Sequence, residues 1–121
     1  MRKLPYGLGV AIVATLYAGF AAAHAVLVSS SPTSGSVLNQ APKEIRLSFN
    51  ERIELRFSSV TVTASDGRKV QTGRAAGDPQ KRNDLVVPVP ALQVGKYQVR
   101  WQATSADSHR IQGSFNFEVK P

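Results

Sequence analysis

The fold class of this chain is decided by one stretch near its end, Gly95-Lys96-Tyr97-Gln98-Val99-Arg100-Trp101-Gln102-Ala103. Apolar and polar side chains alternate there without interruption. Tyr97, Val99 and Trp101 share one face, and charged and amide side chains share the other. A period of two residues is that of a β-strand with one buried face. The stretch therefore predicts a strand that turns its aromatic face into a core.

The same alternation recurs on both sides of this strand, in residues 44–49, 58–64 and 111–119. Residues 85–89 alternate as well, and Pro88 and Pro90 predict that this strand lies at a sheet edge, because proline has no N–H for the ladder. Between the strands, residues 29–36 predict a turn-rich link, Asp66-Gly67 a hairpin-type turn and residues 72–83 a polar loop.

No segment after residue 23 repeats apolar residues with a helical period, and no internal repeat is visible. Several short strands separated by turn signals are typical of an all-β domain, either a Greek-key β-sandwich or a barrel. The chain has no cysteine, so no disulfide can support this small core, and the sheets must do most of the stabilising.

The first 23 residues have the pattern of a secretory signal. Arg2 and Lys3 precede an uncharged apolar run at residues 8–20, and Ala21-Ala22-Ala23 supplies a small-residue cleavage site. The alternative is an uncleaved anchor, but this run is shorter than the roughly 20 residues that span a bilayer as a helix. We expect cleavage after Ala23, which divides the chain into a signal at 1–23 and one exported domain at 24–121.

The formal charge of the whole chain is +7, and removal of Arg2 and Lys3 leaves +5. A basic balance of this kind raises the question of nucleic acid or anionic lipid as a partner. The basic residues are scattered, however, with a local cluster only at Lys81-Arg82, and few aromatic residues lie among them. We interpret the charge as favouring solubility and weak attraction to anionic surfaces, and we expect no nucleic-acid partner.

Cleavage after Ala23 also makes His24 the first residue of the mature chain. An N-terminal histidine offers its α-amine and its imidazole Nδ1, which together close a chelate ring on a metal ion. The only other histidine, His109, follows Asp107 by two residues. Asp107 and His109 share a face if that segment is extended, so both histidines can meet at one metal. The alternative is that His24 is incidental and that Asp107-Ser108 caps a turn.

Six motifs in order give a more specific indication. They are His24 after the signal, Ser30-Ser31-Pro32 with Gly35-Ser36, Leu47-Ser48-Phe49-Asn50-Glu51, Gly95 to Trp101, Ser105-Ala106-Asp107-Ser108-His109 and Gly113-Ser114-Phe115-Asn116-Phe117. In this order the motifs resemble the CopC family of periplasmic copper-resistance proteins, and the likeness covers essentially all of residues 24–121.

The resemblance implies a cupredoxin-like β-barrel that binds one Cu(II) per chain. His24 would contribute its amine and Nδ1, His109 an imidazole and Asp107 a carboxylate oxygen, with Glu51 near the metal without ligating it. Three nitrogens and one oxygen suit a tetragonal Cu(II) ion, although affinity alone does not exclude zinc. Some members of the family carry a methionine-rich Cu(I) loop, in the region that corresponds to residues 61–73. This chain has no Met there, so we expect no Cu(I) site.

The family resemblance implies a non-enzymatic periplasmic protein that sequesters or carries copper and hands it to an inner-membrane partner of the CopD type. The alternative is a copper oxidase or monooxygenase, because two histidines of this kind also form a histidine brace. Asp107 argues against that activity, since it would fill the coordination position that oxygen needs. A metal-free structural or adhesion sandwich is the third hypothesis. No nucleophile arrangement or phosphate-binding loop supports an enzyme of another class.

Overall fold

The computed structural model describes residues 26–121, so the predicted signal and His24 lie outside the described residues. The elements in chain order are β1 (Leu27–Ser31), β2 (Val37–Leu38), β3 (Glu44–Phe49), the 3-10 turn η1 (Leu55–Phe57), β4 (Ser59–Ala64), β5 (Ala76–Asp78), β6 (Lys81–Pro88), β7 (Gly95–Thr104) and β8 (Arg110–Val119). No helix within the described part of the chain is long and apolar enough to cross a membrane.

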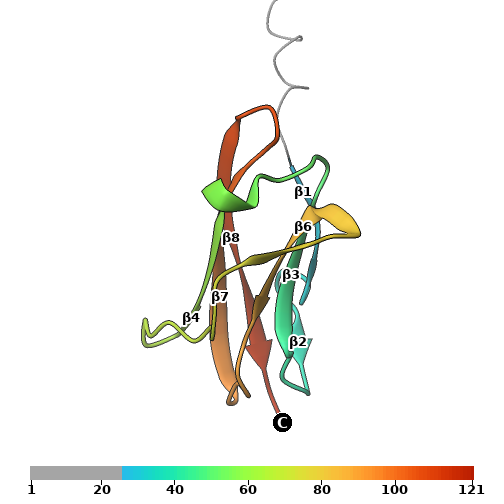
Figure 1. Cartoon of the computed structure of the whole chain (residues 1–121). Helices are drawn as coiled ribbons and strands as arrows, with labels where there is room; N and C mark the ends of the chain where they lie inside the picture. The colour runs from blue at the N-terminus through green and yellow to red at the C-terminus, as the bar shows by residue number, and fades with distance from the viewer. Residues whose placement is uncertain (1–25) are drawn as a thin grey trace, which may run out of the picture.

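The strands form two four-stranded sheets, with the orders β1-β3-β6-β5 and β2-β8-β7-β4. The two sheets face one another along the length of the molecule (Figure 1). The longest pairing is the β7–β8 hairpin, whose antiparallel register runs from Gly95 opposite Val119 to Thr104 opposite Arg110. The predicted all-β sandwich is therefore confirmed.

The core lies between the sheets and contains the residues that the alternation placed on the inner faces. Ile45 and Leu47 of β3, Val62 of β4 and Val99 of β7 are completely buried. Tyr97 stacks on Phe117, its cross-strand partner, with ring centroids 5.4 Å apart. Trp101 also points inward but stays partly exposed, and it packs against the edge of the core.

The prediction that residues 85–89 form an edge strand was wrong. β6 lies inside its sheet, paired with β3 on one side and with β5 on the other. Pro88 is tolerated because it is the last residue of β6, where its carbonyl accepts a hydrogen bond from Thr72 N at 3.2 Å and no further ladder donor is needed. Pro90 lies beyond the strand.

Two segments for which the sequence predicts loops contain strand residues. The polar loop predicted at 72–83 includes β5 and the first residues of β6, and the link predicted at 29–36 begins with the last residues of β1. These residues pair at sheet margins, where one or both faces are solvated, so hydrophobic alternation does not mark them. The turn at Asp66-Gly67 is confirmed, with Gly67 N bonded to Ala64 O at 2.9 Å and a positive φ of 88° at Gly67.

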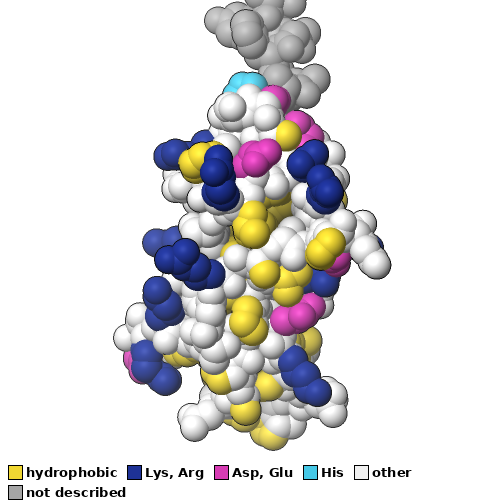
Figure 2. Space-filling model, viewed as in Figure 1, with side chains coloured by type: hydrophobic (Ala, Val, Ile, Leu, Met, Phe, Trp, Pro, Cys, Tyr) yellow, Lys and Arg dark blue, Asp and Glu magenta, His cyan; other side chains and the backbone are white. Residues whose placement is uncertain are grey.

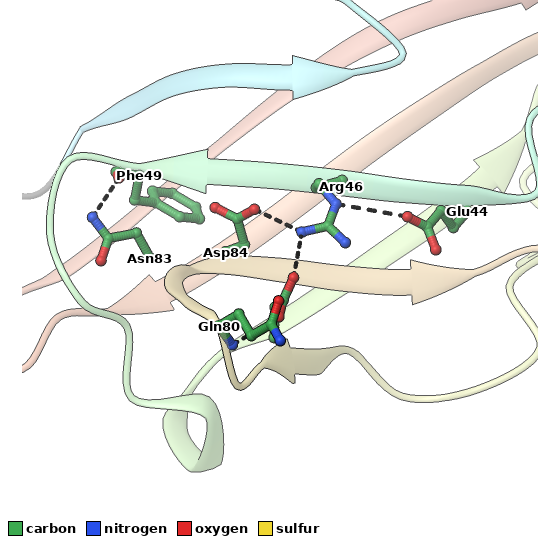
Figure 3. Close-up of polar contacts among 7 residues, drawn as sticks. Glu44, Arg46, Phe49, Gln80, Asn83 and Asp84 are labelled. Carbon is green, nitrogen blue, oxygen red and sulfur yellow. Dashed lines mark hydrogen bonds and ion pairs between the residues drawn. The ribbon is translucent and has the colours of Figure 1, made fainter.

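A partly exposed ionic network lies on the outer face of the β1-β3-β6-β5 sheet (Figure 3). Arg46 Nη1 contacts Asp84 Oδ2 at 2.7 Å and Asp78 Oδ2 at 3.1 Å, and Arg46 Nε lies 3.6 Å from Glu44 Oε2. Asp84 is only 5% exposed, and Arg46 is its ion-pair partner. Hydrogen bonds to Asp84 and Asp78 raise the pKa of Arg46. The network links the three strands β3, β6 and β5.

Candidate metal centre

The Asp107-Ser108-His109 segment forms the turn of the β7–β8 hairpin, at one end of the sandwich (Figure 1). Ser105 N donates to His109 O at 2.8 Å and Ser108 N donates to Ser105 O at 2.9 Å, so the turn is closed by backbone hydrogen bonds. Ser108 has a φ of +75°, a left-handed conformation that non-glycine residues adopt infrequently. This residue reverses the chain between the aspartate and the histidine.

The structure places the side chains of Asp107 and His109 in contact. His109 Nδ1 lies 3.1 Å from Asp107 Oδ2, and both side chains are 46% exposed. Two donors at adjacent corners of a square, each about 2 Å from a metal ion, are about 2.8 Å apart. The observed separation is therefore close to that of two neighbouring ligands, and a small adjustment would let one ion contact both.

The Asp107 carboxylate is held in its ionised form. A hydrogen bond from the Ser105 hydroxyl to Oδ1, followed by the contact with His109, lowers the pKa of Asp107 to about 2. Hydrogen bonds that stabilise a charged form shift the pKa in this direction. At neutral pH the segment thus presents an anionic oxygen beside an imidazole nitrogen, which is a donor pair suited to a divalent cation.

The beginning of the described chain lies at the same end of the molecule. Val26 N donates to Asn50 Oδ1 at 2.6 Å, and Asn50 N donates to Val26 O at 3.0 Å. Two residues further on, Arg52 O accepts a hydrogen bond from Ala106 N at 2.9 Å. The segment after β3 thus connects Val26 to the residue next to Asp107. Figure 2 shows a histidine side chain at this end of the molecule, with acidic side chains nearby.

His24 itself lies outside the described residues, and within residues 26–121 no group of three or more His, Cys, Asp or Glu side chains is arranged to hold a metal. The predicted ligand set of His24, Asp107 and His109 therefore stays a prediction.

Glu51 lies between Asn50 and Arg52, in the segment that joins the chain start to the hairpin turn. Its side chain is partly buried. The structure thus brings Glu51 to the end of the sandwich that carries Asp107 and His109. Its predicted role beside the metal stays a prediction.

Sequence reasoning missed two residues that shape this end of the molecule. Ser105 is completely buried and bonds the Asp107 carboxylate, and Asn50 binds both backbone groups of Val26. Both occur in the motifs quoted above, but a serine or asparagine in a turn is common, and its side-chain partner depends on chain segments far away. Only the tertiary structure shows which partner each has.

Comparison with known proteins gives a consistent result over the whole described domain. The family model described as the CopC domain matches residues 27–120. The copper resistance protein C of Pseudomonas syringae pv. tomato is 35% identical over 111 residues, which cover 87% of each chain. Protein YobA of Escherichia coli K12 is 32% identical over 120 residues, or 98% of this chain and 96% of that one.

Solved structures agree with the sequence relatives. The crystal structure of CopC from Methylosinus trichosporium OB3b superposes with a TM-score of 0.76 at 33% identity, covering 81% of this chain and 95% of that chain. A family model that spans nearly all described residues, relatives at this identity over most of their length and the same sandwich lead to one conclusion: this chain belongs to the CopC family.

Proposed function

We propose that this protein is exported to the periplasm, that its signal at residues 1–23 is removed there, and that the mature chain binds one Cu(II) ion. The ligands are the α-amine and Nδ1 of His24, the carboxylate of Asp107 and the imidazole of His109. The protein acts as a carrier or buffer of copper rather than as an enzyme, and it passes copper to an inner-membrane partner of the CopD type.

The observation that supports this proposal most directly is the Asp107–His109 pair. A carboxylate oxygen and an imidazole nitrogen lie 3.1 Å apart at an exposed turn, with the carboxylate ionised. The hydrogen bonds between Val26 and Asn50 hold the chain start at the same end of the sandwich. A free N-terminus two residues before Val26, with its Cα at most about 7 Å from that anchor, can supply the remaining nitrogens.

The donor set favours Cu(II) over other metals. Imidazole, amine and carboxylate donors in a square arrangement suit a tetragonal Cu(II) ion, which has the highest affinity in the divalent series. Cu(I) prefers thiolate or thioether ligands, and the chain from His24 onward has neither Cys nor Met. The names of the relatives agree with copper as the cargo, since three of them are called copper resistance protein C and another is called copper transport protein CutJ.

The Asp107–His109 contact allows two arrangements at the metal. In the first, Oδ2 and a histidine nitrogen both ligate Cu(II). In the second, Oδ2 accepts the Nδ1–H hydrogen bond and orients the ring, so that Nε2 meets the metal. We favour the first, because the exposed carboxylate offers a second donor at ligand spacing. A carboxylate in that position leaves no open equatorial place for oxygen, which argues against an oxidase.

The test is a titration of purified mature protein, with His24 verified as the first residue by mass spectrometry. We expect one Cu(II) per chain under a competing chelator and a type 2 EPR spectrum with mostly nitrogen ligands. His109→Ala should lower the affinity by orders of magnitude, and Asp107→Ala should lower it less.

A matched control is Asp66→Ala, which removes an exposed carboxylate from the turn after β4 and should leave copper binding unchanged. The melting temperature of the apo protein should change little in His109→Ala, because that side chain is half exposed. Asp107→Ala should lower it more, because it removes the acceptor of the buried Ser105 hydroxyl. Wild-type affinity in His109→Ala, or a second tight site, would refute the proposed centre.

A further inference from the structure

Ser105 is an unusual residue for its position. It follows the last residue of β7 and precedes an exposed turn, yet its exposed fraction is 0%. A buried hydroxyl needs a hydrogen-bond partner, and the Ser105 hydroxyl finds it in Oδ1 of Asp107. The backbone oxygen of His109, 3.3 Å from Ser105 Oγ, is a second acceptor for the same hydroxyl. This one side chain thus contacts both residues of the Asp-x-His segment.

The backbone of Ser105 fixes the same turn. Its N–H donates to His109 O at 2.8 Å, and its carbonyl accepts from Ser108 N at 2.9 Å. On its other side, Ser105 pairs with Ile53 in an isolated β-bridge, and Ile53 belongs to the core. Ser105 is therefore a rigid point, held by the core, from which the exposed turn is built.

Asp107 lies on the exposed side of this turn. Its side chain is 46% exposed, so packing alone does not select one rotamer for it. The carboxylate of Asp107 has two oxygens, of which Oδ1 is bound by Ser105 and Oδ2 lies beside His109 Nδ1. The His109 backbone N–H, 3.4 Å from Oδ1, adds a weak third contact. The Ser105 bond thus decides which oxygen is left facing the histidine.

The geometry points to Ser105 as a positioning residue of the copper centre, whose buried hydroxyl holds Asp107 in the rotamer that presents Oδ2 beside His109 before any metal arrives. This inference rests on the proposed function, because it assigns Ser105 a role toward the metal proposed there. A preorganised ligand loses less conformational freedom on binding. Removal of a residue that orients a metal ligand typically lowers metal affinity about 10–100-fold, and we expect a loss of that size in Ser105→Ala.

The matched control is Ser58→Ala. Ser58 Oγ also bonds the end of β7, accepting from Thr104 N at 3.0 Å and donating to Glu54 O at 2.9 Å, so its hydrogen bonds go to these two residues rather than to Asp107 or His109. Both substitutions remove a partly or fully buried hydroxyl from the same end of the sandwich. A general loss of stability would appear in both variants, whereas the loss of Cu(II) affinity and a changed copper hyperfine splitting should appear only in Ser105→Ala.

Two further measurements separate a positioning role from a merely structural one. In the apo protein, side-chain NMR couplings of Asp107 should report one χ1 rotamer in the wild type and an average over rotamers in Ser105→Ala. In a double-mutant cycle, Ser105→Ala should cost little affinity when Asp107 is already alanine, because Ser105 then has no carboxylate to hold. Ser105→Thr keeps the hydroxyl and should retain the wild-type spectrum.

A Cu(II) affinity equal to that of the wild type and an unchanged EPR spectrum in Ser105→Ala would overturn the inference. Additive losses of affinity in the double-mutant cycle, or a tenfold loss of affinity in folded Ser105→Thr, would overturn it as well. If the wild-type protein fails to bind Cu(II), the proposed function fails instead. The rotamer measurement on the apo protein needs no metal, so it still shows whether Ser105 positions the carboxylate.

Discussion

The attachment of His24 to the rest of the centre allows a quantitative prediction. Val26 is held to Asn50 by two hydrogen bonds of 2.6 and 3.0 Å. From this anchor, two residues let the Cα of His24 reach at most about 7 Å. One glycine inserted between Ala25 and Val26 extends that reach to about 10.5 Å, and two extend it to about 14 Å.

All donors survive these insertions, so only their local concentration changes. The volume open to His24 grows with the cube of its reach, which dilutes the donors about threefold for one glycine and about eightfold for two. An alanine added before His24 has a different effect, because it converts the α-amine into an amide and removes one donor and the chelate ring. We expect that change to lower the Cu(II) affinity about 10²–10⁴-fold, as when one arm of a bivalent contact is lost.

The assay is isothermal titration with Cu(II) under a competing chelator, on four proteins whose first residues have been verified by mass spectrometry. Apo melting temperatures provide the control, and they should agree within a few degrees because the changes lie before the first strand. If the one-residue extension binds as tightly as the wild type, the amine is not a ligand. If one inserted glycine lowers the Cu(II) affinity as much as the alanine added before His24, the Val26 anchor does not determine how His24 reaches the site.

Three further predictions concern other parts of the structure. Because the folded pKa of Asp107 is lowered to about 2, its carboxylate stays ionised down to about pH 3, so the protons that displace copper on acidification go to the nitrogen ligands. Asp107→Asn should weaken Cu(II) binding and move the pH of half-release upward, while the number of protons taken up per copper released, measured in a pH-stat, stays the same. Arg46→Leu leaves Asp84 buried without its partner, which should lower the free energy of unfolding by about 2 kcal/mol. The loss is smaller than for a fully buried pair because Arg46 is partly exposed. Copper affinity should stay unchanged, and an unaltered urea midpoint would contradict the prediction. Gly113→Ala would bring a Cβ within 2.7 Å of Trp101 Cη2, so the indole ring must shift. The free energy of unfolding should fall by about 1 kcal/mol, and the tryptophan emission spectrum should change.

Much of the fold could be predicted because alternation with a period of two needs only local information. The segments at 44–49, 58–64, 95–103 and 111–119 became β3, β4, β7 and β8 within a residue or two. The sheet order could not be predicted in this way. Pro88 suggested an edge, yet β6 is central because β5, a three-residue strand without an apolar pattern, covers its other side. Pairing between distant segments is a property of the folded chain.

The sequence alone determined the chemistry available to the proposed copper site: two histidines, one aspartate two residues before the second of them, and no Cys or Met after His24. The tertiary structure decided which groups meet. It turned Oδ2 of Asp107 toward His109 through a buried serine, and it placed Val26 beside Asn50 at the same end of the sandwich. The physical reason is the sequence separation of the interacting residues. Residue types and periodicity can be determined from neighbouring positions, whereas hydrogen bonds and packing with residues that are distant in the sequence set the direction of a side chain.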